Sequence, residues 1–293
     1  MVTYRQDRIL SGRGPKPPQF AHGLRGLAVD RDDALYAVGD SRVEVFDPDG
    51  NPLRRWPTGQ AGYSVAAADD GSVWVGQAGQ VEIFEPDGQL RDAWQDPWHL
   101  GLVTAVGFAG DDVFFADAQA RCIRRYDRQG TLLGNIGDKH RKGGFHIPNG
   151  VVDFAVDAEG ILHVANPGMH RVEHYTADGE LLGHFGRFDG IDPAGFPGCC
   201  NPTNVALAGD GRVAVTEKAG PRAKIYDRDG QLLAVVATEE AFDPAAKNMD
   251  LAVDSRGRIY VADTIRFQIC VFEPLASSAD APTAAAVREE VAS

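Results

Sequence analysis

The sequence predicts an all-β fold, namely a six-bladed β-propeller of four-stranded blades whose ring is closed by the N-terminal strand. A short phrase that ends in a DG-type turn recurs five times, with its final glycines 38, 42, 49 and 51 residues apart. A second phrase, two apolar runs joined by an acidic turn, precedes each copy and occurs six times. No window shows the sustained i, i+3, i+4, i+7 apolar spacing of a helix, so repeated four-stranded units fit best.

The two phrases divide each unit into strand, turn, strand, turn, strand, DG turn and strand. The DG phrase occupies residues 45–50, 83–88, 125–130, 174–179 and 225–230, and a last copy at 271–274 lacks the turn. The two-run phrase is clearest at 27–38, 154–166 and 251–263 and weaker at 65–76, 105–117 and 205–217. Its runs are rich in β-branched and aromatic residues, and the Asp and Gly steps supply turn chemistry.

Ring closure follows from the count of strands. The sixth unit ends after Phe272 without a fourth strand, and residues 4–11 form an unmatched strand-like segment that could supply it. Such pairing of first and last segments would remove an exposed sheet edge. Residues 276–293 are small and polar, so we expect the propeller to span 1–275 and a flexible tail to follow it.

Composition limits the partners and the compartment. The chain has 42 acidic and 29 basic residues, a net charge of −13, and an acidic surface repels nucleic-acid phosphates. No apolar run approaches the roughly 18 residues of a membrane helix. The N-terminus lacks the apolar core of a signal peptide, so we expect a cytoplasmic protein as written, or a secreted or periplasmic one if a leader has been removed.

One unit carries a family resemblance. The residues at 251–254, 257, 259–263, 269 and 271–272 resemble an NHL repeat, and the likeness extends over about residues 24–274. The NHL-type and related six-bladed propellers include lyases, lactonases and pure binding scaffolds. The resemblance therefore implies an architecture without fixing the chemistry.

The loops that join one unit to the next are the long ones, at 138–152, 186–202 and 238–249. These loops share a face with the starts of the innermost strands, which lie near the axis of the ring. Long loops above an axial channel are the usual place for a ligand site. We expect a small-molecule ligand there, with Tyr63 and Thr104 among the residues that contact it.

Alignment of the innermost strands puts one residue of each unit at a common axial level. These residues are Gly26, Ser64, Thr104, Asp153, Asn204 and Asp250. Asp153, Asn204 and Asp250 come from three consecutive units, and their oxygen atoms suit a hard cation, Ca²⁺ or Mg²⁺ in preference to Zn²⁺. The alternative is that the three side chains cap strand ends and hold water in the channel.

Two further resemblances concern this level. The oxygen-rich cluster is similar to the axial sites of gluconolactonase and paraoxonase propellers, and residues 148–150 (Pro-Asn-Gly) match an Asn-Gly found there, whereas Arg25 stands where an acidic residue of the first blade would be. Residues 201–206 resemble a blade start of peptidylglycine-amidating lyase. The zinc histidines of that enzyme match Arg25, Tyr63, Val103, Val152, Thr203 and Met249 here, so its zinc site is not implied.

The ends of the second strands form another ring on the same face. Its members are Gly39, Gln77, Asp117, Asn166, Glu217 and Asp263. A carboxylate here commonly braces the following turn, and a ligand-binding role for Asn166 and Asp263 is the alternative. Glu217 and Lys218 could form an acid/base element with Arg25 nearby, or a solvated ion pair. His170 lies on the rim near basic residues 139, 141 and 142, which could attract an anion.

Adjacent cysteines, Cys199 and Cys200, lie in a rim loop before Pro202. Three interpretations stay open. A vicinal disulfide would form a rigid wall for a ligand, two thiolates could bind a soft metal or take part in redox chemistry, or both thiols could be inert. Cys122 and Cys270 fall within predicted strands and are expected in the core.

The leading functional hypothesis is a small-molecule-binding propeller with an axial rim pocket. If it is an enzyme, we expect a metal-dependent hydrolase, such as a lactonase, or a lyase, with Glu217 as the first candidate base. The alternative is a non-catalytic scaffold that docks proteins on the loop rim through aromatic residues such as Trp94, Trp98 and Phe188.

Overall fold

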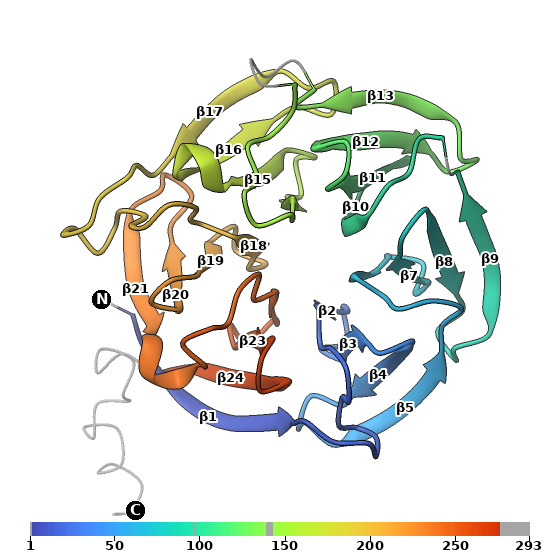
Figure 1. The fold of residues 1–293 in the computed structure, drawn as a ribbon, viewed down its shortest axis with the longest axis horizontal. Helices are drawn as coiled ribbons and strands as arrows, with labels where there is room; N and C mark the ends of the chain where they lie inside the picture. Colours follow the sequence, from blue (N-terminus) through green and yellow to red (C-terminus); the bar gives the residue numbers. More distant parts are fainter. Residues whose placement is uncertain (1, 97, 139–142, 276–293) are drawn as a thin grey trace, which may run out of the picture.

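The computed structural model describes residues 2–96, 98–138 and 143–275. Six four-stranded antiparallel sheets stand around a central axis as the blades of a propeller, which confirms the predicted fold class (Figure 1). Blades 1 to 5 run in chain order from the axis to the outer edge, and blade 6 takes its outermost strand from the N-terminus. In Figure 1 the first blade is blue, and strands β23 and β24 of the last blade are red. Two short 3₁₀ turns, Pro167–Met169 and Glu239–Ala241, are the helical segments of the described chain.

The strand bounds follow the predicted repeat. Blade 1 consists of β2 (Gly26–Val29), β3 (Leu35–Gly39), β4 (Arg42–Phe46) and β5 (Pro52–Pro57). Blade 2 consists of β6 (Ser64–Ala67), β7 (Val73–Gly76), β8 (Gln80–Phe84) and β9 (Leu90–Gln95). Blade 3 consists of β10 (Val103–Ala109), β11 (Asp112–Asp117), β12 (Cys122–Asp127) and β13 (Leu132–Ile136). Blade 4 consists of β14 (Asp153–Val156), β15 (Leu162–Asn166), β16 (Arg171–Tyr175) and β17 (Leu181–Phe185). Blade 5 consists of β18 (Asn204–Leu207), β19 (Val213–Glu217), β20 (Arg222–Tyr226) and β21 (Leu232–Ala237). Blade 6 consists of β22 (Leu251–Val253), β23 (Ile259–Asp263), β24 (Gln268–Leu275) and β1 (Thr3–Ser11).

The recurring DG phrase forms the turn between the third and fourth strand of a blade. In blade 5 the carboxylate of Asp227 accepts hydrogen bonds from the backbone N–H groups of Asp229 (3.0 Å) and Gln231 (2.8 Å). Gly230 takes a φ of 79°, a left-handed conformation that glycine adopts without steric penalty. The aspartate and the glycine therefore both favour the reversal of the chain at this turn.

The N-terminal strand closes the ring as predicted. Strand β1 pairs antiparallel with β24 from Thr3 opposite Leu275 to Ser11 opposite Gln268, so the two ends of the propeller share one sheet (Figure 1). Leu10 of β1 is buried among side chains of blades 1 and 6, including Phe46 and Ile269. This pairing removes the edge that an open ring of sheets would expose.

The apolar core lies between neighbouring blades rather than in one central mass. Trp56 of blade 1, for example, packs against Phe84 of blade 2 with ring centroids 5.8 Å apart. The axis itself is lined by the starts of innermost strands, where polar side chains gather. In the described residues no helix is long and apolar enough to cross a membrane. The tail expected at 276–293 lies outside these residues.

Ring closure makes a prediction about two neighbouring residues of β1. Leu10 is 9% exposed and Ile9 is 48% exposed. Leu10→Ala should lower the free energy of unfolding by about 2–4 kcal/mol, because it leaves a cavity between the first and last blades. Ile9→Ala is the matched control and should change it by less than about 1 kcal/mol. Urea unfolding followed by circular dichroism measures both, and similar losses in the two variants would contradict the closure.

Candidate functional site

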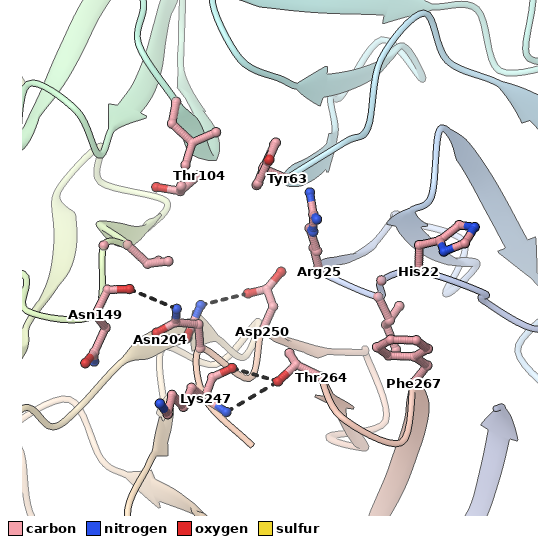
Figure 2. Close-up of a pocket in the computed structure, with 16 residues that line it drawn as sticks. His22, Arg25, Tyr63, Thr104, Asn149, Asn204, Lys247, Asp250, Thr264 and Phe267 are labelled. Carbon is pink, nitrogen blue, oxygen red and sulfur yellow. Dashed lines mark hydrogen bonds between the residues drawn. The ribbon is translucent and has the colours of Figure 1, made fainter. Parts of the chain in front are cut away.

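A cavity of about 390 Å³ opens at the axis, on the face that carries the loops between blades (Figure 2). Its lining residues come from every blade and from the inter-blade loops: His22, Gly23, Leu24, Arg25, Tyr63, Leu102, Thr104, Asn149, Gly150, Val151, Asn204, Lys247, Asn248, Asp250, Thr264 and Phe267. Of the residues predicted from sequence, Arg25, Tyr63, Thr104, Asn204 and Asp250 lie in this wall. Asp153 lies directly behind it.

The predicted axial level exists, and most of its side chains cross to the next blade. Ser64 Oγ donates a hydrogen bond to the carbonyl of Val103 (3.1 Å), and Thr104 Oγ1 donates one to the carbonyl of Val152 (2.6 Å). Each hydroxyl thereby satisfies a carbonyl at the start of the following blade, that of the first residue of β10 or of the residue just before β14. Buried backbone groups at the axis need such partners because no strand is available on that side.

The two aspartates of this level accept hydrogen bonds where the hydroxyls donate them. Asp153 Oδ2 accepts the N–H of Val205 (2.8 Å), and Asp250 Oδ2 accepts the N–H of Leu27 (2.7 Å). Val205 and Leu27 occupy the same place in blades 5 and 1. Part of the alternative interpretation is therefore correct, since each carboxylate braces the neighbouring blade through one oxygen atom.

Asn204 lies between the two aspartates. Its amide nitrogen is 3.5 Å from Asp250 Oδ1 (Figure 2), while its own Oδ1 is buried and has no hydrogen-bond partner in the described structure. Asp153 and Asn204 are 4% and 3% exposed, and Asp250 reaches the cavity surface. The three side chains predicted to form a site do lie together, although no group of three His, Cys, Asp or Glu side chains among the described residues is arranged as a metal ligand set.

Burial controls the ionisation of these carboxyl groups. Burial raises the pKa of Asp250 to about 7, against hydrogen bonds from Leu27, Leu251 and Asn204 that lower it. Burial, followed by repulsion from Asp250, raises the pKa of Asp153 well above its ordinary value. Two adjacent carboxyl groups in a buried site cannot both stay ionised unless a cation compensates their charge. Without a cation, at least one of them binds a proton.

A cation of the protein faces the acid pair across the cavity. The guanidinium of Arg25 stacks on the ring of Tyr63, with Cζ 4.2 Å from the ring centroid, and its Nη1 is buried without a hydrogen-bond partner. Arg25 and Asp250 both line the cavity (Figure 2), and among the described residues no ion pair joins them. An unpaired guanidinium nitrogen in a cavity is a donor available to an anionic or carbonyl group of a ligand.

Glu217, the predicted base, does not line the cavity. Its side chain is fully buried, accepts a hydrogen bond from Arg222 Nε (2.8 Å) and forms an ion pair with Lys224. Because this carboxylate is buried away from the cavity and paired with Arg222 and Lys224, it cannot contact a ligand there, and the position does not support a catalytic role. Lys218 is not in the cavity wall either, and instead lies beside the rim cysteines.

The reason for a glutamate at this point lies on the third strand of the blade. In blades 2 and 4 the residue at the end of the second strand contacts the third residue of the next strand, as Gln77 contacts Glu82 and Asn166 contacts Glu173, both at 3.0 Å. In blade 5 the third residue is Lys224, so an acid replaces the amide and the pair keeps its complementarity. The Glu217–Lys224 pair thus takes the place of the amide–glutamate pairs, with the acid on the second strand and the partner on the third.

The remaining predicted ligand contacts also serve the framework. Asp263 Oδ1 accepts the N–H groups of Ile265 (2.9 Å) and Arg266 (2.8 Å), which is the turn-bracing role expected for this ring. Asn166 is fully buried, and His170 Nδ1 lies 3.1 Å from the carbonyl of Phe196. None of these three residues lines the axial cavity. Basic residues 139, 141 and 142 lie outside the described residues.

The rim cysteines carry free thiols in this structure, with their Sγ atoms 2.9 Å apart. Cys199 is exposed and Cys200 is buried. The carbonyl of Cys200 accepts a hydrogen bond from Asn149 Nδ2 (3.3 Å), so the loop contacts a residue of the cavity wall. Cys122 and Cys270 are buried in strands as expected.

Several cavity residues were not predicted as contacts. Lys247 and Asn248 come from the loop before β22, and Thr264 and Phe267 from the turn after β23. Thr264 Oγ1 donates to the carbonyl of Lys247 (2.8 Å), and Asn248 Nδ2 donates to the carbonyl of Asn149 (3.2 Å) (Figure 2). The length of the loop at 238–249 was the available signal. The residues of such loops cannot be aligned with residues of the other blades, because the loops differ in length and sequence from one blade to the next.

No protein-family model matches the sequence, and no curated protein sequence does. The resemblance to NHL repeats therefore stays a prediction. Among solved structures, a protein of unknown function from Bacteroides thetaiotaomicron is similar over 94% of this chain and 77% of its own, with TM-score 0.69 and 15% identity.

Two further structures carry stated functions. An inactive variant of virginiamycin B lyase from Staphylococcus aureus, solved with quinupristin, is similar over 87% of this chain and 82% of its own, with TM-score 0.57 and 14% identity. The WD40 β-propeller domain of Doa1 is similar over 92% and 97%, with TM-score 0.62 and 15% identity. Identities this low establish the β-propeller fold alone, a fold that serves both a lyase and a WD40 domain in these neighbours.

The raised pKa of Asp250 predicts a pH dependence of stability. Between the ordinary value of 3.8 and about 7 the folded protein binds more protons at this carboxyl than the unfolded chain does. Its contribution to stability is therefore full below the lower value and is lost as the pH rises through about 7.

The variant Asp250→Asn keeps an acceptor for Leu27 and cannot ionise. The free energy of unfolding of the wild type minus that of the variant should fall by about 1–4 kcal/mol from pH 4 to pH 8. Urea titrations across this range in the presence of a chelator measure the difference. A difference that is constant, or that grows with pH, would contradict the raised pKa.

Proposed function

We propose that the axial cavity binds a small polar molecule and that Asp153, Asn204 and Asp250 hold a divalent cation at its floor. One observation supports this most strongly, namely that two buried carboxyl groups converge on an amide whose Oδ1 has no hydrogen-bond partner. A buried acid pair needs a compensating charge, and a cation supplies it while also satisfying the amide oxygen.

The donor set fits a hard cation. Asp153 and Asp250 each accept a backbone N–H at Oδ2, Asp250 Oδ1 has a long contact of 3.5 Å from the amide nitrogen of Asn204, and Asn204 Oδ1 has no partner. Three oxygen donors suit Ca²⁺ or Mg²⁺ and leave coordination positions for water and a ligand, whereas Zn²⁺ prefers nitrogen and sulfur donors. With no histidine or cysteine at the axial level, Ca²⁺ and Mg²⁺ are favoured.

The same wall supports metal-assisted hydrolysis or lyase chemistry. A bound divalent cation would polarise a carbonyl group of the ligand. Arg25, held flat on Tyr63 with a free Nη1, would bind an anionic or carbonyl oxygen and orient the molecule across the cavity. The virginiamycin B lyase among the structural neighbours is an example of a lyase built on this fold. Glu217 has no part in this proposal because it is buried away from the cavity.

Isothermal titration with Ca²⁺ and with Mg²⁺ tests the cation site. The wild type should bind one equivalent of at least one of these ions, and the double variant Asp153→Asn, Asp250→Asn should bind none. Asparagine preserves the two acceptors for backbone N–H groups, so circular dichroism should show an unchanged fold. Asp87→Asn, in an exposed turn, is the control and should bind like the wild type. A wild type that binds neither ion, or a double variant that still binds, would overturn the cation site.

A second function is favoured by one separate observation. Trp98, Phe188 and Ile191 lie in inter-blade loops and are 90%, 62% and 97% exposed. Trp94, in contrast, packs against Trp74 with ring centroids 5.0 Å apart and is not available for docking. We propose that these rim residues contact a protein partner through an apolar segment.

A triple variant, Trp98→Ala, Phe188→Ala and Ile191→Ser, tests the docking role. Crosslinking in extract followed by mass spectrometry should show a protein captured by the wild type and lost from the variant. Leu53→Ala, which replaces an exposed apolar residue on the outer strand β5, is the control and should retain the partner. A partner pattern that is identical in wild type and triple variant would exclude this surface.

A further inference from the structure

We propose that Cys199 and Cys200 form a redox-active dithiol that exchanges electrons with low-molecular-weight disulfides, at a site distinct from the axial acid pair. The two Sγ atoms lie 2.9 Å apart, and the thiol of Cys200 donates a hydrogen bond to the sulfur of Cys199. Neither thiol is needed for the cation or for the packing of a blade core. The pair therefore carries a chemistry of its own.

The two thiols differ in access and in acidity. Cys199 is exposed, and the hydrogen bond from Cys200 together with the positive charge of Lys218 lowers its thiol pKa. Cys200 is 2% exposed, and burial raises its thiol pKa. An accessible thiolate beside a protected second thiol is the arrangement of an attacking and a resolving cysteine.

The loop is held in place around this pair by Asn201. Its Nδ2 donates to the carbonyls of Pro197 (2.7 Å) and Lys218 (3.0 Å), and its Oδ1 accepts the N–H of Lys218 (2.8 Å). These three hydrogen bonds fix the Lys218 backbone next to the cysteines. The backbone from which the Lys218 side chain extends is therefore fixed beside the Cys199 thiol that its charge favours as a thiolate.

The exchange balances in two steps. The Cys199 thiolate attacks one sulfur of a disulfide R–S–S–R, so that a Cys199–S–S–R bond forms and one thiolate leaves. Cys200 then loses its proton and attacks the Cys199 sulfur, which forms the Cys199–Cys200 disulfide and releases the second thiolate. One proton passes from Cys200 to a leaving thiolate, the other leaving thiolate carries the negative charge that Cys199 held, and two electrons pass from protein sulfur to the reagent.

The Cys199–Cys200 disulfide would be easily reduced, unlike a disulfide that stabilises a fold. Adjacent Cα atoms are only about 3.8 Å apart, less than the usual separation of about 4.4–6.8 Å for a disulfide. A strained and partly exposed disulfide is readily reduced again. The other two cysteines cannot take this part, because burial raises the pKa of Cys122 to about 11 and that of Cys270 to about 12.

Intact-mass spectrometry and peptide mapping of the full chain test the exchange. The reduced wild type, incubated with oxidised glutathione at neutral pH, should lose two hydrogens at the peptide containing residues 199 and 200 and keep no glutathione. Reduced dithiothreitol should restore the original mass. Cys200→Ser should trap one glutathione on Cys199, and Cys199→Ser should stay unmodified. An unchanged wild type, or a wild type with a persistent glutathione adduct, would overturn the dithiol.

Lys218→Met separates an activated thiol from one that is merely exposed. In the Cys200→Ser background, the rate of alkylation of Cys199 by iodoacetamide should rise with pH, and Lys218→Met should move the midpoint of that rise upward. Lys247→Met, which changes an exposed lysine of the axial cavity, should leave the midpoint unchanged. Equal midpoints with and without Lys218 would contradict the assigned role of this residue.

Discussion

Hydrogen bonds that pass from the start of one innermost strand to the next blade are the interactions on which the axial site depends. Ser64 and Thr104 donate to carbonyls, while Asp153 and Asp250 accept from N–H groups, so the pattern reverses partway around the ring. Gly26 completes the level, since a Cβ there would lie 2.8 Å from Cα of Ser64. The need to satisfy buried backbone groups thereby places Asp250 in the wall of a cavity and Asp153 directly behind it.

These acids then do more than brace the blades. Each uses Oδ2 to accept a backbone N–H, and Asn204 between them has an Oδ1 with no partner. A framework that required only hydrogen-bond acceptors at these two positions could use the neutral side chain of asparagine. Blades 2 and 3 likewise use neutral side chains, the hydroxyls of Ser64 and Thr104, as donors. Two carboxyl groups instead create a charge that burial makes unfavourable unless a proton or a cation neutralises it. This excess of charge is what distinguishes a candidate site from a structural ring.

The repeat phase made much of this arrangement predictable. The six blades, the closure by β1 and the common axial level follow from aligning internal copies, because an insertion in a loop does not change which residue begins a strand. The burial of Glu217 away from the cavity was not predictable, because its partner Lys224 lies on a different strand and the pairing appears only when third strands are compared. Lys247 and Thr264 lie in segments without repeat copies, where contacts depend on loop conformation.

The shared charge of Asp153 and Asp250 is the central claim, and it can be measured on the carboxyl carbons themselves. A ¹³C NMR titration of aspartate-labelled protein, run with chelator and again with Ca²⁺ and with Mg²⁺, reports the ionisation of each group. Without metal, at least one of the two carboxyl resonances should titrate near or above pH 7, and a bound cation should shift that titration to lower pH. If both groups titrate near their ordinary value of 3.8 in every condition, the buried pair carries no excess charge and the account fails.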